Sequence, residues 1–132
     1  MSTPSLTSIM LSSTDPERLH EWYRSAFPPQ TDDVNEEYRV LGYGGVYLFI
    51  DTRDDVGPKT AEPGRVLLNF EVDDAHAAVE RVERCGCEWL APLEDRDGSL
   101  FATAIDPDGN YVQLIQLSEA HRVETATAAG QE

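Results

Sequence analysis

The chain has 132 residues and a formal net charge of −15 at pH 7, which suits a single domain with its own core. A surface this acidic argues against nucleic acid or anionic membranes as partners, because phosphates require basic side chains. No apolar run in the sequence approaches the ~20 residues of a membrane span. Residues 1–8 lack the basic and apolar parts of a signal peptide, so we expect a cytoplasmic protein.

Residues 7–27 predict a short apolar strand followed by an amphipathic helix. Asp15 is a natural N-cap, and Pro16 suits the first helical position because no N–H is missed there. Apolar side chains then recur at helical spacing, at Leu19, Trp22, Tyr23 and Ala26. We therefore expect Trp22 in the core, and His20, which falls off this stripe, in solvent.

Residues 66–86 repeat the same pattern at an offset of 59, which places Thr7 on Val66 and Asp15 on Asp74. Asp73 or Asp74 caps the second helix, and Gly86 ends it. The later strands also correspond, since residues 44–50 overlie residues 109–115 at an offset of 65. The chain is therefore predicted to hold two copies of a strand–helix–strand–strand–strand module.

Residues 106–117 predict a hairpin turn and an alternating strand. Pro107 fixes φ at the first central position of the turn, and Gly109 can adopt the positive φ required where the turn joins the next strand. Behind the turn, Tyr111, Gln113 and Ile115 share one face of the strand, while Val112 and Leu114 share the other.

With these elements in order, the sequence resembles the vicinal oxygen chelate superfamily, which includes glyoxalase I, bleomycin resistance proteins and extradiol dioxygenases. The resemblance runs from about Leu6 to Leu117 and rests on LSSTDPERLHEWYRSAF (11–27), FEVDD (70–74), CGCEW (85–89) and FATAIDPDGNYVQLIQL (101–117). It implies an α+β fold of two βαβββ modules, forming a curved eight-stranded mixed sheet around a cleft with the helices on its outer face. Family members usually form homodimers, so we expect one here.

The resemblance implies one glyoxalase/bleomycin-resistance-like domain over residues 1–117, with modules at about 5–53 and 64–117. Residues 118–132 form a polar tail that is low in large apolar side chains, and we expect it to be frayed or only partly ordered.

Metal-dependent members of the family place their ligands at four inward strand positions, which carry over to Ser8, Leu48, Leu67 and Gln113. Leucine has no lone pair, and serine and a lone glutamine amide are weak ligands. Of the three histidines, His20 and His76 lie off the apolar stripes of their helices and His121 lies in the tail. We therefore expect no catalytic metal and no other cofactor.

The cleft is then expected to be lined by apolar side chains with a few polar groups, which is typical of small-molecule pockets. An alternative is that the same side chains fill the cleft as core. By strand parity, Met10, Ile50, Tyr111 and Ile115 belong to the wall, with Ser12 and Asn69 as polar points. Trp89 either stacks on a planar ligand or packs in the core. The residues that we expect to bind ligand are Ser8, Met10, Leu48, Leu67, Asn69, Trp89, Tyr111 and Gln113.

Glu71 also faces the cleft by parity and is the best candidate for acid–base catalysis, because a carboxylate among apolar side chains has a raised pKa. The alternative is a structural ion pair with Arg39 or Arg65. Cys85 and Cys87 are expected to be reduced, and no second pair of cysteines completes a zinc site.

These features favour a metal-free protein that binds an apolar or aromatic small molecule, similar to the bleomycin resistance type. The alternatives are a metal-independent isomerase, cyclase or degenerate lyase of the same superfamily, or a domain whose pocket has closed and which serves as a dimeric interaction module.

Overall fold

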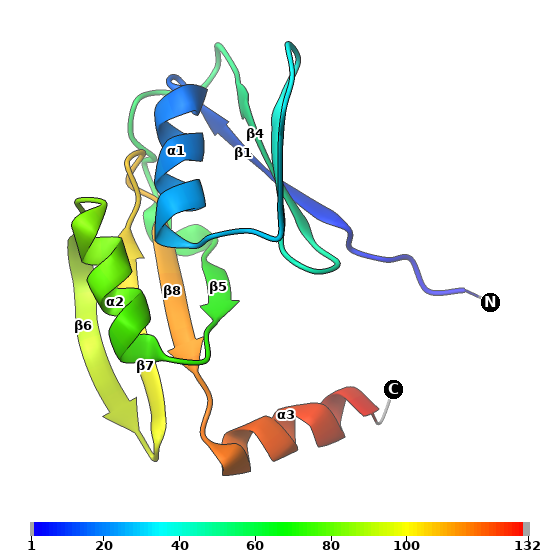
Figure 1. Ribbon diagram of the computed structural model, residues 1–132. Helices are drawn as coiled ribbons and strands as arrows, with labels where there is room; N and C mark the ends of the chain where they lie inside the picture. The colour runs from blue at the N-terminus through cyan, green and yellow to red at the C-terminus, as the bar shows by residue number, and fades with distance from the viewer. Residues whose placement is uncertain (1, 131–132) are drawn as a thin grey trace.

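The computed structural model describes residues 2–130, with side chains as far as Glu124, and consists of two similar modules (Figure 1). The first module comprises β1 (Ser8–Ser13), α1 (Pro16–Ala26), β2 (Thr31–Val34), β3 (Arg39–Gly42) and β4 (Tyr47–Thr52). Its sheet has the order β1-β4-β3-β2, in which β1 runs parallel to β4 and the other pairs are antiparallel.

The second module repeats this arrangement after a connecting segment that includes the short 3₁₀ helix η1 (Pro63–Arg65). It comprises β5 (Leu68–Glu71), α2 (Ala75–Arg84), β6 (Glu88–Arg96), β7 (Ser99–Ile105) and β8 (Tyr111–Gln116), in the sheet order β5-β8-β7-β6. The predicted α+β fold of two βαβββ modules is therefore confirmed. The expectation of one eight-stranded sheet is corrected, because the strands hydrogen-bond as two separate sheets of four.

The helix boundaries follow from local capping. The Asp15 carboxylate accepts a hydrogen bond from the N–H of Arg18 (3.2 Å), and Asp74, rather than Asp73, accepts one from the N–H of Ala77 (3.1 Å). Gly86 follows α2 with a φ of +77°, where a side chain would be strained. The caps that the sequence predicts thus begin and end both helices at the expected places.

The core lies where α1 packs on β1, β3 and β4, and α2 packs on β7 and β8. The two helices also contact each other, since Nε1 of Trp22 donates to the carbonyl of Gly86 (3.4 Å). Phe27 at the end of α1 stacks on Phe70 of β5 with ring centroids 4.3 Å apart. Each sheet therefore has one face against its helix and one face turned away, and we call the latter the distal faces.

The C-terminal segment differs from the expectation of a frayed tail. It forms helix α3 (Glu119–Gly130), which extends from the end of β8, and Gln131 and Glu132 lie outside the described residues (Figure 1). The start of α3 is fastened to β7, because the buried Ser99 hydroxyl contacts Nδ1 of His121 and accepts a hydrogen bond from the N–H of Ser118 (2.8 Å). Within the described residues, none of the helices has the length and apolar character needed to cross a bilayer.

Candidate functional site

The distal face of the first module carries predicted ligand-binding residues from β1. Ser8, Met10 and Ser12 alternate along this strand and lie beside Tyr47, Phe49 and Asp51 of β4 in the parallel register. Met10 is 57% exposed and Tyr47 is 46% exposed. This face thus presents large apolar side chains to solvent, which is the expected behaviour of a binding surface rather than of a core.

The distal face of the second module brings together the other polar points. Asn69 of β5 lies directly beside Gln113 of β8, and one step along the strands Glu71 lies beside Ile115. Tyr111 belongs to the same face, and its ring lies near Gly64 of η1, where an added Cβ would come within 3.7 Å of it. Leu67 precedes β5 and is 36% exposed. Two amide side chains therefore stand next to each other between apolar neighbours.

Leu48 does not belong to this site, which corrects the sequence-based expectation. It lies opposite Ile9 in the β1–β4 register, is 3% exposed and belongs to the core, and Ile50 is likewise fully buried there. Since Ile9 corresponds to Leu68, and Leu68 pairs with Val112, the counterpart of Leu48 is Val112 and the true offset of the later strands is 64.

The residue of β4 that corresponds to Gln113 is therefore Phe49, which lies beside Met10 as Gln113 lies beside Asn69. A shift of one residue in the alignment moved every side chain of the strand to the opposite face.

Two further expectations about aromatic and histidine side chains are corrected. Trp89 pairs with the buried Ala104 and packs against the core, so it does not stand on the distal face. His20 is 8% exposed instead of solvated, and its Nε2 lies 2.8 Å from the Asp32 carboxylate. Trp22 is buried in the core and His76 is exposed, as predicted.

The residues at the family's ligand positions do not fit a divalent metal. With the corrected register these positions hold Ser8, Phe49, Leu67 and Gln113, and two of the four offer no lone pair. Among the described residues, no three His, Cys, Asp or Glu side chains are grouped so that they could hold a metal ion.

Glu71 is exposed, so the enclosure among apolar side chains on which its acid–base hypothesis depends is missing. Arg65, one of the ion-pair partners expected for it, pairs with Glu62 instead (2.9 Å). Cys85 and Cys87 are both free thiols, as predicted, and partial burial raises the pKa of each. A raised pKa lowers the thiolate fraction, which disfavours a nucleophilic role.

One hollow in the surface reaches a predicted site residue. It has a volume of about 370 Å³ and is lined by Met10 and Ser12 of β1, by Lys59 and its neighbours in the segment between the modules, and by Asp108 and Asn110 of the β7–β8 turn. The hollow thus opens beside β1 at the junction of the two modules.

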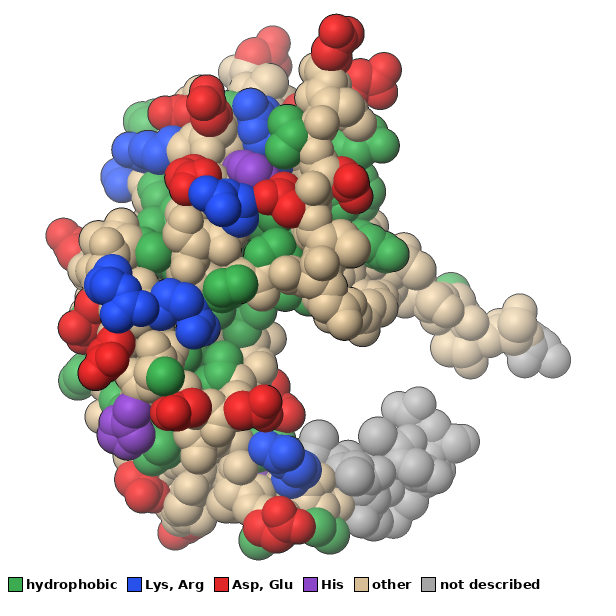
Figure 2. Space-filling view, in the orientation of Figure 1, with side chains coloured by type: hydrophobic (Ala, Val, Ile, Leu, Met, Phe, Trp, Pro, Cys, Tyr) green, Lys and Arg blue, Asp and Glu red, His purple; other side chains and the backbone are tan. Residues whose placement is uncertain are grey.

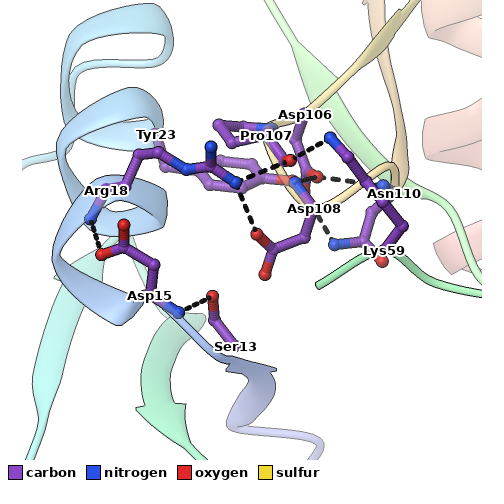
Figure 3. Close-up of polar contacts among 9 residues, drawn as sticks. All are labelled: Ser13, Asp15, Arg18, Tyr23, Lys59, Asp106, Pro107, Asp108 and Asn110. Atoms are coloured by element: carbon purple, nitrogen blue, oxygen red, sulfur yellow. Dashed lines mark hydrogen bonds and ion pairs between the residues drawn. The ribbon is translucent and has the colours of Figure 1, made fainter. Parts of the chain in front are cut away.

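A buried carboxylate network, which the sequence did not predict, joins the modules at this junction (Figure 3). Asp106 is 2% exposed, and its carboxylate accepts hydrogen bonds from the hydroxyl of Tyr23 (2.7 Å), from Nδ2 of Asn110 (2.9 Å) and from the N–H groups of Asp108 and Asn110. Burial raises the pKa of Asp106, although these donors oppose the rise. Burial and the adjacent Asp106 carboxylate raise the pKa of Tyr23 well above its ordinary value, so Tyr23 remains a donor.

Two cations reinforce the same junction. Nη2 of Arg18 and Nζ of Lys59 both donate to the carbonyl of Pro107, at 3.0 and 2.6 Å. Arg18 also lies 3.5 Å from the buried Oδ1 of Asp108, which has no hydrogen-bond partner. Figure 3 shows Arg18 and Lys59 approaching the turn from α1 and from the connecting segment. This cluster therefore holds α1, the connecting segment and the β7–β8 turn together.

Comparison with known proteins agrees with this architecture. The model of the glyoxalase-like domain family matches residues 8–115, and the chain belongs to that family. A search of the curated proteins found no match in sequence.

Several solved structures share the fold. A glyoxalase-related enzyme from Fulvimarina pelagi is 20% identical, with a TM-score of 0.72 over 87% of this chain and 89% of its own. The fosfomycin resistance protein FosX from Mesorhizobium loti is 19% identical, with a TM-score of 0.67 over 93% of this chain and 98% of its own. TioX from Micromonospora sp. ML1 is 19% identical, with a TM-score of 0.63 over 86% of this chain and 98% of its own. At these identities the likeness concerns the fold alone.

Proposed function

We propose that this protein binds an apolar or aromatic small molecule on its distal faces without a metal ion. The observation that carries the proposal is that the distal faces present both apolar and uncharged polar side chains: the exposed Met10 lies beside the half-buried Phe49 on the first, and Asn69 lies beside Gln113 on the second. Apolar surface supplies affinity, and a small number of polar groups fixes the orientation of a ligand.

Metal independence is part of the proposal because of the donor set. Phe49 and Leu67 stand where the family's metal-dependent members carry ligands, and hydrocarbon side chains cannot coordinate an ion. The protein is therefore expected to act by binding, with the ligand held by dispersion, apolar burial and hydrogen bonds. The exposure of Glu71 offers no support for the alternative of an isomerase or cyclase.

A thermal-shift screen tests both parts. Addition of Ni²⁺, Zn²⁺, Mn²⁺ or Fe²⁺ should leave the melting temperature unchanged, whereas members of a panel of aromatic natural products should raise it. A ligand at a hundredfold excess over its Kd stabilises the native state by about 2.7 kcal/mol, which is an easily measured shift. Stabilisation by a metal at stoichiometric concentration would contradict the proposal.

A pair of matched variants ties the binding to the distal faces. Met10 on β1 is 57% exposed and Val123 on α3 is 55% exposed, so replacing either with serine should leave the fold intact. Met10→Ser should weaken a ligand found in the screen, because a large apolar contact is lost. Val123 belongs to helix α3 and to neither sheet, so the Val123→Ser variant should bind that ligand as the unmodified protein does.

We also propose that the protein works as a homodimer. β1 and β5 are each at the edge of their sheet, and an unpaired edge next to exposed apolar side chains is a surface that a second copy covers well. The expected interface exceeds about 1,000 Å² in total. Sedimentation velocity should give a dimer at micromolar concentration, and a monomer there would reject this part of the proposal.

A further inference from the structure

The distribution of charge around the distal faces bears on the kind of ligand. The chain contains only ten Lys and Arg residues against 25 Asp and Glu residues. Arg18 and Arg24 lie on α1, Arg81 and Arg84 lie on α2, and Arg122 lies on α3. Figure 2, which views the molecule over α1 and α2, shows basic side chains interspersed with acidic ones on that side. Half of the cations are therefore on helices.

Three cations outside the helices belong to the first module or to the segment that connects the modules. Arg53 pairs with Asp55, and Lys59 is bound to the Pro107 carbonyl. Arg39 of β3 pairs with Ile50, which places it on the core side of the sheet.

Two arginines do come near a distal face, and each is already neutralised. Arg65 follows Gly64, which lies near the Tyr111 ring, and pairs with Glu62. Arg96 lies over the ring of Phe101, 5.0 Å from its centroid, and pairs with Glu94. Within the described side chains, the arginine on the strands of the second module, Arg96, is thus paired with a carboxylate, whereas Lys59 lines the hollow beside Met10 at the junction of the modules.

Carboxylates, by contrast, occupy distal positions in both modules. The strand registers place five of them there, namely Asp33, Asp51, Glu71, Glu88 and Glu94, of which Glu94 is paired with Arg96. Glu71 stands one step along β5 from Asn69, so an anion at the amide pair meets a negative charge at close range. Together with the net charge of −15, these groups give the faces a negative potential that repels anions and attracts cations.

The two amide side chains on the distal face of the second module carry no charge. Asn69 and Gln113 each offer an amide oxygen as acceptor and an amide N–H₂ as donor. A ligand group that presents both a donor and an acceptor satisfies such a pair, whereas a carboxylate or phosphonate presents acceptors only. Tyr111 and Ile115 flank Gln113 along the strand and suit an aromatic body attached to that group.

From these placements we propose that the ligand of the distal face of the second module is an aromatic compound with an amide-type head and no negative charge, and that this face excludes anionic analogues. This inference rests on the proposed small-molecule binding and adds the chemical class of the ligand. Discrimination comes from hydrogen bonds to Asn69 and Gln113 together with repulsion by the surrounding carboxylates.

The test uses three probes of the same skeleton: 2-naphthamide, the cationic 2-naphthamidine and the anionic 2-naphthoate. Binding is followed by the side-chain amide NMR signals of Asn69 and Gln113. Naphthamide and naphthamidine should shift these signals, and naphthoate should bind at least about tenfold more weakly than naphthamide. Added salt should weaken the amidine and leave the neutral amide unchanged, because only the charged probe is screened.

Variants separate the two sources of discrimination. Gln113→Ala should weaken naphthamide about tenfold, and Gln30→Ala, on an exposed loop of the first module, should leave its affinity unchanged. Glu71→Lys should admit naphthoate. If naphthoate binds the unmodified protein as tightly as naphthamide, the inference on ligand class is wrong while the proposed function stands. If no probe moves the Asn69 and Gln113 signals up to millimolar concentration, the proposed function and this inference both fail.

Discussion

The Tyr23–Asp106 hydrogen bond allows a quantitative prediction for the module junction. Tyr23 is fully buried, and its hydroxyl lies 2.7 Å from the Asp106 carboxylate. Tyr23→Phe removes only the hydroxyl oxygen, so it opens almost no cavity and isolates the loss of this bond. Hydrogen bonds to charged groups contribute about 1.5–3 kcal/mol. We therefore expect the free energy of unfolding at pH 7 to fall by about 2 kcal/mol.

Tyr43→Phe is the matched control. The Tyr43 hydroxyl donates to the uncharged carbonyl of Phe27 at the same distance of 2.7 Å, and the side chain is partly buried. A neutral hydrogen bond contributes about 1 kcal/mol. Burial raises the pKa of Tyr43 well above its ordinary value, so this hydroxyl stays protonated at every pH of the experiment and the effect of the control should not depend on pH.

The effect of Tyr23→Phe should depend on pH, with a sign that follows from the raised pKa of Asp106. A carboxyl with a raised native pKa favours folding most below its unfolded pKa, and this contribution is lost as pH rises through its native value. Removing the Tyr23 donor raises that pKa further, because one group that favours the charged form is gone. The variant therefore loses more stability at pH 7, where the carboxyl is ionised, than at pH 3.

Urea unfolding followed by the fluorescence of Trp22 and Trp89 at both pH values measures these differences. A cost for Tyr23→Phe at pH 7 no larger than that for Tyr43→Phe would refute the reasoning. A cost of equal size at pH 3 and pH 7 would show that the Asp106 carboxylate is not the group that the hydroxyl stabilises.

Other predictions address the remaining polar contacts and one turn. Arg18→Met should lower the free energy of unfolding by roughly 1 kcal/mol, because the buried Oδ1 of Asp108 loses its cation while the exposure of Arg18 limits the effect. In urea unfolding, the double variant with Asp108→Asn should recover part of that loss. His20→Ala should loosen the β2–β3 hairpin from α1, since His20 contacts Asp32 there, and limited proteolysis should then cut within residues 31–42 faster than in the unmodified protein. Gly86→Ala should cost about 1 kcal/mol from backbone strain alone, because φ is +77° and no atom beyond the adjoining residues lies within 4 Å of the added Cβ; a negligible change in melting temperature would contradict this.

Local physical chemistry made much of the fold predictable from the sequence. Asp15, Asp74 and Gly86 act within one helical turn of themselves, so their roles as caps did not depend on distant contacts. The alternation along β5 and β8 was also assigned correctly, because Phe70 and Leu114 on the core side differ plainly from Asn69 and Gln113 on the distal side.

Tertiary structure decided the points at which the pattern was ambiguous. Strand β4 reads YLFIDT, in which apolar residues occupy both faces at its start, so the sequence did not distinguish Leu48 from Phe49 as the distal residue. Only the pairing of Leu48 with Ile9 under α1 made that choice. His20 contacts Asp32 of the β2–β3 hairpin, and Asp106 accepts a hydrogen bond from Tyr23, which lies 83 positions earlier in the chain. Such contacts join segments far apart in the sequence, and the periodicity of a single helix or strand contains no information about which partner will cover it.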